Sequence, residues 1–127
     1  MMSATKQRLI PLYTTRGDLG AILRYPFLFN PLGEWIGWVT SKRAVYSVYG
    51  SYVGQISEEW RLLRPRNLDF RHPSSPPPQN PGKIIPPAHF PLPPLMPELP
   101  INQIDVLEDL PRLLPPMDSG EFKPDLE

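Results

Sequence analysis

The stretch Leu12-Tyr13-Thr14-Thr15-Arg16-Gly17 begins a pattern that recurs twice in the first half of the chain. The other two copies are Leu28-Phe29-Asn30-Pro31-Leu32-Gly33 and Val45-Tyr46-Ser47-Val48-Tyr49-Gly50. Each copy places an aliphatic residue before an aromatic one and reaches a glycine four residues after the aromatic. The second copy has proline and glycine where a type I turn favours them. The pattern predicts three tight turns, each preceded by a strand.

Each predicted turn is followed by an apolar phrase that contains a further glycine. The three phrases are Leu19-Gly20-Ala21-Ile22, Trp35-Ile36-Gly37-Trp38-Val39 and Tyr52-Val53-Gly54-Gln55-Ile56, so Gly20, Gly37 and Gly54 recur at a spacing of 17. A glycine inside a strand is typical of a bulge, a bend or a close backbone approach. We interpret the glycines as the points where three hairpins bend around a shared axis; a central hole for a ligand is the alternative.

The residues between these phrases are rich in β-branched and aromatic types, which predicts six strands. We place them at 10–14, 19–24, 26–30, 34–40, 44–48 and 51–57. A hairpin is marginally stable alone, so the three must share one core. A fourth unit would begin near Trp60, where the glycines are missing, and one more strand there would complete the ring.

These repeats, with their basic connectors and proline-rich tail, resemble the bacterial 4-fold β-flower domain. In that family hairpin "petals" surround a pseudo-fourfold axis in a shallow barrel. Residues 12–56 carry the resemblance, which implies the fold, carries no catalytic residues and implies no activity. The residues assigned to the structural repeat are Gly17, Gly20, Gly33, Gly37, Gly50, Gly54, Tyr13, Phe29, Tyr46, Trp35 and Trp38.

Composition divides the 127-residue chain into unlike halves at residue 64. Residues 1–64 hold 3 of the 20 prolines and carry 8 basic and 4 acidic residues, or +4. The remainder holds 17 prolines and carries 5 basic and 9 acidic residues, or −4. We therefore predict a disordered N-terminus at 1–9, an all-β barrel of three to four petals at 10–64, and a mostly disordered, acidic, proline-rich tail at 65–127.

The tail contains two features of its own. Pro91, Pro94, Pro97 and Pro100 recur every third residue, which aligns them on one edge of a polyproline II helix. Such an edge fits either a stiff spacer, which we favour, or a ligand for aromatic grooves of other proteins. After it, Ile101, Ile104, Leu107 and Leu110 fall on one face of a helix predicted at 101–110, which Pro111 ends. A helix this short needs a docking partner to be stable.

No catalytic constellation is evident, so we expect no enzyme, no cofactor and no metal site. His72 and His89 are the only histidines, and both lie in the proline-rich tail rather than beside a nucleophile. The chain has no cysteine, which excludes disulfides and thiolate metal ligands. The apolar run Ala21 to Phe29 is too short to span a membrane and contains Arg24 and Pro26. We expect a cytoplasmic protein.

Three functions are compatible with these features. The first is a non-enzymatic interaction or scaffold module that binds protein through the proline-rich arm. The second is binding of a small apolar ligand or lipid in a barrel mouth lined by petal aromatics. The third and least favoured is binding of single-stranded nucleic acid, for which basic residues would have to alternate with exposed rings. The residues considered for it are Arg16, Arg24, Lys42, Arg43, Arg61, Arg64, Arg66 and Arg71, with Tyr25, Trp38, Tyr49 and Tyr52.

Overall fold

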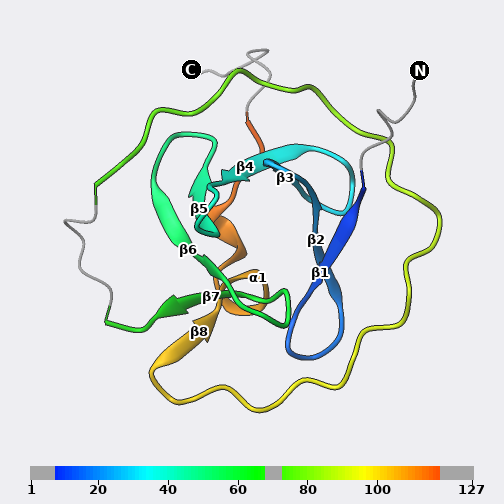
Figure 1. The fold of residues 1–127 in the computed structure, drawn as a ribbon, viewed down its shortest axis with the longest axis vertical. Helices are drawn as coiled ribbons and strands as arrows, with labels where there is room; N and C mark the ends of the chain where they lie inside the picture. Colours follow the sequence, from blue (N-terminus) through cyan, green and yellow to red (C-terminus); the bar gives the residue numbers. More distant parts are fainter. Residues whose placement is uncertain (1–7, 68–72, 118–127) are drawn as a thin grey trace, which may run out of the picture.

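Eight antiparallel strands form a single sheet that curls around a central axis (Figure 1). The structure is a computed structural model that describes residues 8–67 and 73–117. Strands follow one another in chain order across the sheet, so every connection joins neighbours. They are β1 (Ile10–Tyr13), β2 (Leu19–Arg24), β3 (Phe27–Phe29), β4 (Trp35–Val39), β5 (Ala44–Ser47), β6 (Tyr52–Ile56), β7 (Leu62–Pro65) and β8 (Gln103–Asp105). The all-β prediction is confirmed.

Four hairpins, or petals, make up the ring: β1–β2, β3–β4, β5–β6 and β7–β8. The first six strands lie within about one residue of their predicted bounds, because alternating apolar residues and turn residues act locally. The fourth petal differs from the prediction in its second strand. Leu63 pairs with Asp105 and Arg64 with Ile104, so a strand from the predicted tail completes the hairpin. The domain boundary predicted at residue 64 therefore falls inside a petal.

The inner face of the ring holds one main core. Leu12, Leu28, Val45 and Leu62 occupy the first strand of each successive petal, and all four are fully buried. Their register partners in the first three petals are small: Leu12 faces Ala21, Leu28 faces Gly37, and Val45 faces Gly54. Aliphatic side chains from each petal thus meet near the axis, while small residues let the strands approach one another closely.

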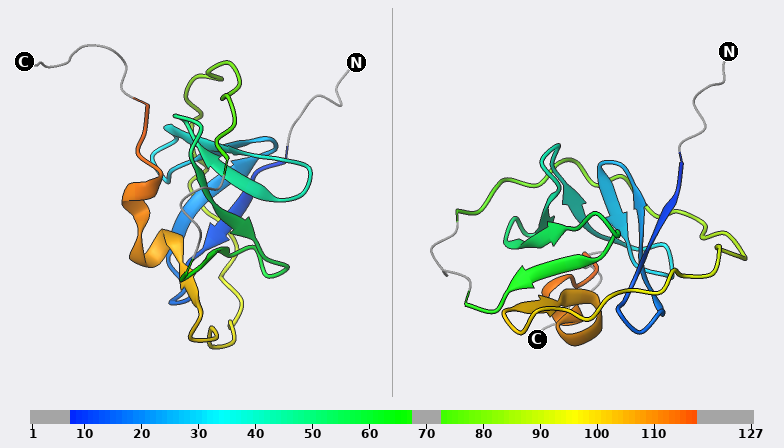
Figure 2. Two further views of the ribbon diagram at one scale, coloured as in Figure 1. Left: turned by 90° about the vertical axis from the view of Figure 1, so that its left-hand side faces the viewer. Right: turned by 60° about the horizontal axis from the view of Figure 1, so that its bottom comes forward.

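A short helical segment lies against one side of the curled sheet (Figure 2). It consists of α1 (Val106–Asp109) and the 3-10 helix η2 (Pro111–Leu113). Val106 and Leu114 are buried in the same core as the petal leucines, and Leu107 packs against that core. The predicted helix at 101–110 is wrong in extent: Gln103–Asp105 pair as β8, and α1 has only four residues. The ladder with β7 outcompetes a helix that is too short to be stable alone.

Residues 73–100, which we call the strap, follow the outside of the ring almost completely around (Figure 1). The strap passes over the petal turns in reverse order. Ser75 donates its amide hydrogen to the Gly50 carbonyl (2.9 Å), and Ile84 donates to the Gly33 carbonyl (3.0 Å). Further on, the Tyr13 hydroxyl donates to the Pro91 carbonyl, and the Arg61 guanidinium donates to the Pro97 carbonyl (3.0 Å). The prediction of a disordered tail is wrong for these residues, since the ring supplies their partners.

One edge of the strap faces the ring at a period of three residues. Its partly buried positions include 75, 78, 81, 84, 90, 93, 96 and 99. Polyproline II has three residues per turn and no internal hydrogen bonds, so a single edge can be buried along its whole length. Ile84 and Phe90 pack with the buried Phe29 and Trp35 in a second apolar cluster outside the ring. The strap therefore covers the outer side of the first two petals.

Candidate functional site

An apolar pocket of about 320 Å³ opens at the end of the ring where successive petals are joined. Leu23, Val39 and Ile56 form its floor at the ends of β2, β4 and β6, and all three are buried. We call this pocket the mouth; its lining residues are Ile10, Leu23, Tyr25, Val39, Thr40, Ser41, Arg43, Ile56 and Trp60. Its size is at the lower end of the range of small-molecule sites, and such sites are mostly apolar.

Arg43 and Trp60 form one wall of the mouth as a stacked pair. The Arg43 guanidinium carbon lies 4.6 Å from the centroid of the Trp60 ring. The Arg43 Nη1 donates to the Ser57 carbonyl (2.8 Å), which helps to hold the guanidinium over the Trp60 ring. Both residues come from turns between petals, Arg43 from the β4–β5 turn and Trp60 from the β6–β7 turn.

These two turns share their geometry with the three turns inside the petals. In all five, the amide of the fourth residue donates to the carbonyl of the first, as in a type I turn followed by a left-handed residue. The fourth residues, all with positive φ, are Gly17 (95°), Gly33 (88°), Arg43 (68°), Gly50 (89°) and Trp60 (65°). A positive φ is unusual for a residue with a bulky side chain and carries a conformational cost.

The strap explains why the petal turns need glycine. A Cβ atom on Gly33 would collide with the Ile84 carbonyl oxygen, and one on Gly50 would lie 2.5 Å from the Ser75 carbonyl oxygen. Among the described residues, none of those that line the mouth belongs to the strap, and the β4–β5 and β6–β7 turns carry side chains at the fourth position. The chain nevertheless accepts the left-handed strain at Arg43 and Trp60, and both side chains line the mouth. Strain of this kind concentrates at functional sites.

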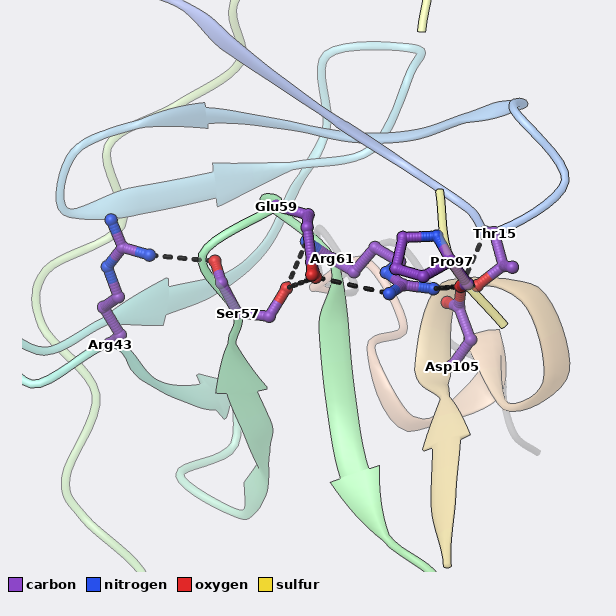
Figure 3. A network of polar contacts seen from close by, with 7 residues as sticks. All are labelled: Thr15, Arg43, Ser57, Glu59, Arg61, Pro97 and Asp105. Atoms are coloured by element: carbon purple, nitrogen blue, oxygen red, sulfur yellow. Dashed lines mark hydrogen bonds and ion pairs between the residues drawn. The ribbon is translucent and has the colours of Figure 1, made fainter. Parts of the chain in front are cut away.

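A polar clasp joins the first petal to the fourth (Figure 3). The Asp105 carboxylate is buried, and its Oδ2 accepts from the Thr15 amide (2.7 Å) and the Thr15 hydroxyl (2.6 Å). The Thr15 hydroxyl in turn accepts from the buried Arg61 Nη1 (3.1 Å). These bonds connect β8 to the β1–β2 turn, where the two edge strands of the sheet approach each other.

The clasp continues toward the mouth through Glu59 and Ser57 (Figure 3). The Arg61 Nη2 lies 3.3 Å from the Glu59 carboxylate, which also accepts from the Ser57 hydroxyl (2.9 Å). These contacts, the Ser57 hydroxyl first, lower the pKa of Glu59 below its ordinary value. Because the Ser57 carbonyl also holds Arg43, one polar chain runs from the mouth to the ring closure.

The glycines predicted to mark a common bend do not all occupy the same structural position. A Cβ on Gly37 would collide with the Tyr46 carbonyl oxygen, and one on Gly54 would collide with the Leu63 carbonyl oxygen. Gly20 instead faces the Leu107 side chain of α1. In the first petal, Ala21 holds the register position that Gly37 and Gly54 hold in the second and third. The sequence spacing between the first two petals is one residue shorter than that between the second and third.

The petal aromatics lie outside the ring rather than in the mouth. Phe29 and Trp35 are buried in the outer cluster, and the Tyr13 hydroxyl binds the strap. Trp38 stacks on Tyr46 with ring centroids 4.9 Å apart. None of these five residues is among those that line the mouth. The aromatic residues that line the mouth are instead Tyr25 and Trp60, which lie outside the three repeats.

The four strap prolines predicted to form one edge do so, and that edge points away from the ring. Pro91, Pro94, Pro97 and Pro100 are all exposed. The Pro91 and Pro97 carbonyls accept hydrogen bonds from the petals, while the side chains of both prolines face outward. Of the predicted helix face, Ile101 is exposed, Ile104 lies in β8, and Leu107 and Leu110 pack on the core. These residues do not form one surface.

Several basic residues considered for nucleic-acid binding have partners within the chain. Arg24 lies over the Phe29 ring at 5.2 Å, and Arg64 donates to the Val53 carbonyl (2.9 Å). Arg16 pairs with Glu108 at 3.3 Å. Arg71 and His72 fall outside the described residues. Within residues 8–67 and 73–117, no cluster of His, Asp and Glu is suited to a metal ion, and no helix is long and apolar enough to cross a membrane.

Comparison with known proteins identifies the family. No curated protein and no solved structure matches the chain. A family profile described as "4-fold beta flower protein" matches residues 10–122, and so includes the four petals, the strap and the helical segment. The match spans most of the chain and agrees with the four hairpins that surround one axis. The chain belongs to the 4-fold beta flower protein family.

Proposed function

We propose that the protein is a non-enzymatic binding module that takes a small apolar ligand in its mouth. The observation that carries this proposal is a pocket of about 320 Å³ whose floor is entirely aliphatic. The described residues that line it include no histidine and no carboxylate, which are the side chains that most often serve as general acid or base. Burial of apolar ligand surface against Leu23, Val39 and Ile56 would supply the affinity.

The strained wall of the mouth supports the same proposal. Glycine would adopt the left-handed conformation at Arg43 and Trp60 without steric strain, as it does at Gly17. Two large side chains stand there instead, and they stack against each other beside the apolar floor. The stacking offsets part of the backbone strain, and it also gives the mouth a rigid aromatic face.

Binding can be tested with 1-octanol, a neutral probe that has a short apolar chain. Titration into ¹⁵N-labelled protein should shift the Trp60 indole N–H and the amides of the mouth turns. Ile10→Trp, which narrows the mouth from the β1 side, should abolish these shifts. Ile85→Trp is the matched control, since Ile85 is 91% exposed on the strap. Shifts scattered over the surface, or shifts that survive in Ile10→Trp, would refute the proposal.

A second candidate function is binding of a protein partner through the outward edge of the strap. The observation that favours it is the exposure of Leu92 (91%) and Leu95 (102%) between the outward prolines. A stiff, already ordered edge binds with little further entropy loss. Double substitution Leu92→Ser with Leu95→Ser should remove any partner captured by the wild-type chain. Retention of every partner by this variant would rule out the strap as the contact.

A further inference from the structure

Arg43 places a positive charge at the mouth. Among the described residues that line the pocket, it is the only charged one. Its guanidinium is held from two sides, by the Trp60 ring at 4.6 Å and by the Ser57 carbonyl at 2.8 Å from Nη1. A side chain held in this way has already lost the rotamer freedom that binding would otherwise cost. The cation is therefore preorganised at the edge of an apolar pocket.

The acidic residues of the β6–β7 turn, which carries Trp60, are directed away from Arg43. Glu59 accepts from the Ser57 hydroxyl and pairs with Arg61, which draws its carboxylate toward the clasp (Figure 3). Glu58 of the same turn is exposed and does not line the mouth. Within the described part of the chain, the ion pairs join Arg16 to Glu108 and Arg61 to Glu59, and neither involves Arg43.

The donor geometry of Arg43 suits an anionic oxygen group. A guanidinium carries five N–H donors in a planar fork, and one of the Arg43 donors is directed to Ser57. The fork matches a carboxylate in a bidentate arrangement, and stacking on an aromatic face does not block its edge. A ligand that filled the aliphatic floor with its chain would place its end group at this edge.

We propose that the ligand of the mouth is an apolar molecule with a terminal carboxylate, which binds the Arg43 guanidinium. This inference rests on the proposed function and adds the chemical class of the ligand. The apolar body contacts the floor formed by Leu23, Val39 and Ile56. The carboxylate remains at the rim, where it is only partly removed from water and its charge is balanced by Arg43. Molecules of the size of a medium-chain fatty acid suit the volume of about 320 Å³.

The test compares three probes with one apolar chain and different end groups: octanoate, 1-octanol and octylammonium. Dissociation constants come from the NMR shifts of the Trp60 indole N–H at low salt. Octanoate should bind about tenfold or more tightly than 1-octanol, because a hydrogen bond to a charged group contributes at least that factor. Octylammonium should bind more weakly than the alcohol. Arg43→Gln should reduce octanoate to the affinity of 1-octanol.

Two further variants keep the test decisive. Lys42→Gln removes a charge from an exposed neighbour that does not line the mouth, and octanoate affinity should be unchanged. Arg43→Lys retains the charge without the planar fork and should give an intermediate affinity. The affinity of each variant for 1-octanol reports whether its mouth is intact, so loss of folding is not mistaken for loss of the carboxylate contact.

The outcomes distinguish this inference from the function on which it rests. If 1-octanol and octanoate bind equally to the wild type, or if Arg43→Gln leaves octanoate affinity unchanged, the carboxylate contact is wrong while the apolar site stands. If none of the three probes binds in the mouth, both the proposed function and this inference are overturned.

Discussion

The Arg43 guanidinium lies 4.6 Å from the centroid of the Trp60 ring, and both residues have a positive φ. The pair comes from two successive inter-petal turns and forms a wall of the mouth. The equivalent turns under the strap have glycine at this position. At Gly33 and Gly50 the strap leaves no room for a side chain, whereas the β4–β5 and β6–β7 turns carry one.

Replacement of Arg43 by glycine should change the free energy of unfolding by less than about 1 kcal/mol. Relief of the left-handed strain, about 1–2 kcal/mol, offsets the lost stacking on Trp60 of about 0.5–1 kcal/mol and the greater entropy of the unfolded glycine chain. Urea denaturation measures the difference. A loss above about 2 kcal/mol would mean that Arg43 is kept for folding rather than for the mouth.

Gly33→Ala should destabilise the protein by about 2 kcal/mol or more, because its methyl group would collide with the Ile84 carbonyl of the strap. Gly82→Ala is the matched control. Gly82 also has a positive φ, of 84°, but a Cβ there meets nothing within 4 Å. The control should therefore report backbone strain alone. Equal losses in the two variants, measured by thermal unfolding, would show that the strap does not rest on the Gly33 turn.

Hydrogen exchange should show the strap bound along the ring in solution. The amides of Ser75 and Ile84 donate to Gly50 and Gly33, so their exchange should be slowed well beyond that of an unstructured chain. Leu92 and Leu95 are exposed, and within the described residues their amides have no backbone acceptor, so they should exchange fast. Rapid exchange at Ser75 and Ile84 as well would place the strap free of the ring.

Asp105→Asn should lower the free energy of unfolding by about 1–3 kcal/mol, because the buried carboxylate accepts from both the amide and the hydroxyl of Thr15. An amide in its place offers a single acceptor oxygen and brings two donors into a site already filled with donors. Asp109→Asn, an exposed change in α1, serves as control and should have little effect. If the two variants unfolded at the same urea concentration, Asp105 would not be closing the ring.

Stability should decline in acid partly through Glu59. Its pKa is lowered by the Ser57 hydroxyl and by Arg61, so the folded state favours the ionised carboxylate. The resulting stabilisation is present above the ordinary pKa of 4.5 and is lost as the pH falls through the lowered value. Glu59→Gln should flatten the pH dependence of the urea midpoint below that pH. Parallel curves for the wild type and the variant would contradict this assignment.

Much of the ring was predictable because its signals are local. Asn30-Pro31-Leu32-Gly33 predicts a turn from its own residues, and β2 lies where its run of apolar residues places it. The spacing of 17 between Gly20, Gly37 and Gly54 matches the structural register only between the second and third petals. Between the first and second petals, equivalent register positions are 16 residues apart, so Ala21 takes the place of Gly20.

The mouth was not predictable from residue types, because its lining comes from the ends of strands in different petals. Leu23, Val39 and Ile56 look like ordinary strand residues until the sheet curls and brings them together. Arg43 and Trp60 carried a weak signal, since each stands at the fourth position of a turn where other copies have glycine. This signal can be interpreted only when the five turns are known to share one backbone geometry.

An all-β chain with three complete petals is predictable from residue types alone, since strand formation and turn chemistry depend on neighbouring residues. Three features depend instead on contacts between distant segments: the second strand of the fourth petal, the path of the strap and the closure through Thr15 and Asp105. A polyproline segment has no internal hydrogen bonds, so its own residues do not predict which surface it will bind. Its position depends on carbonyls and apolar side chains that only the assembled ring presents.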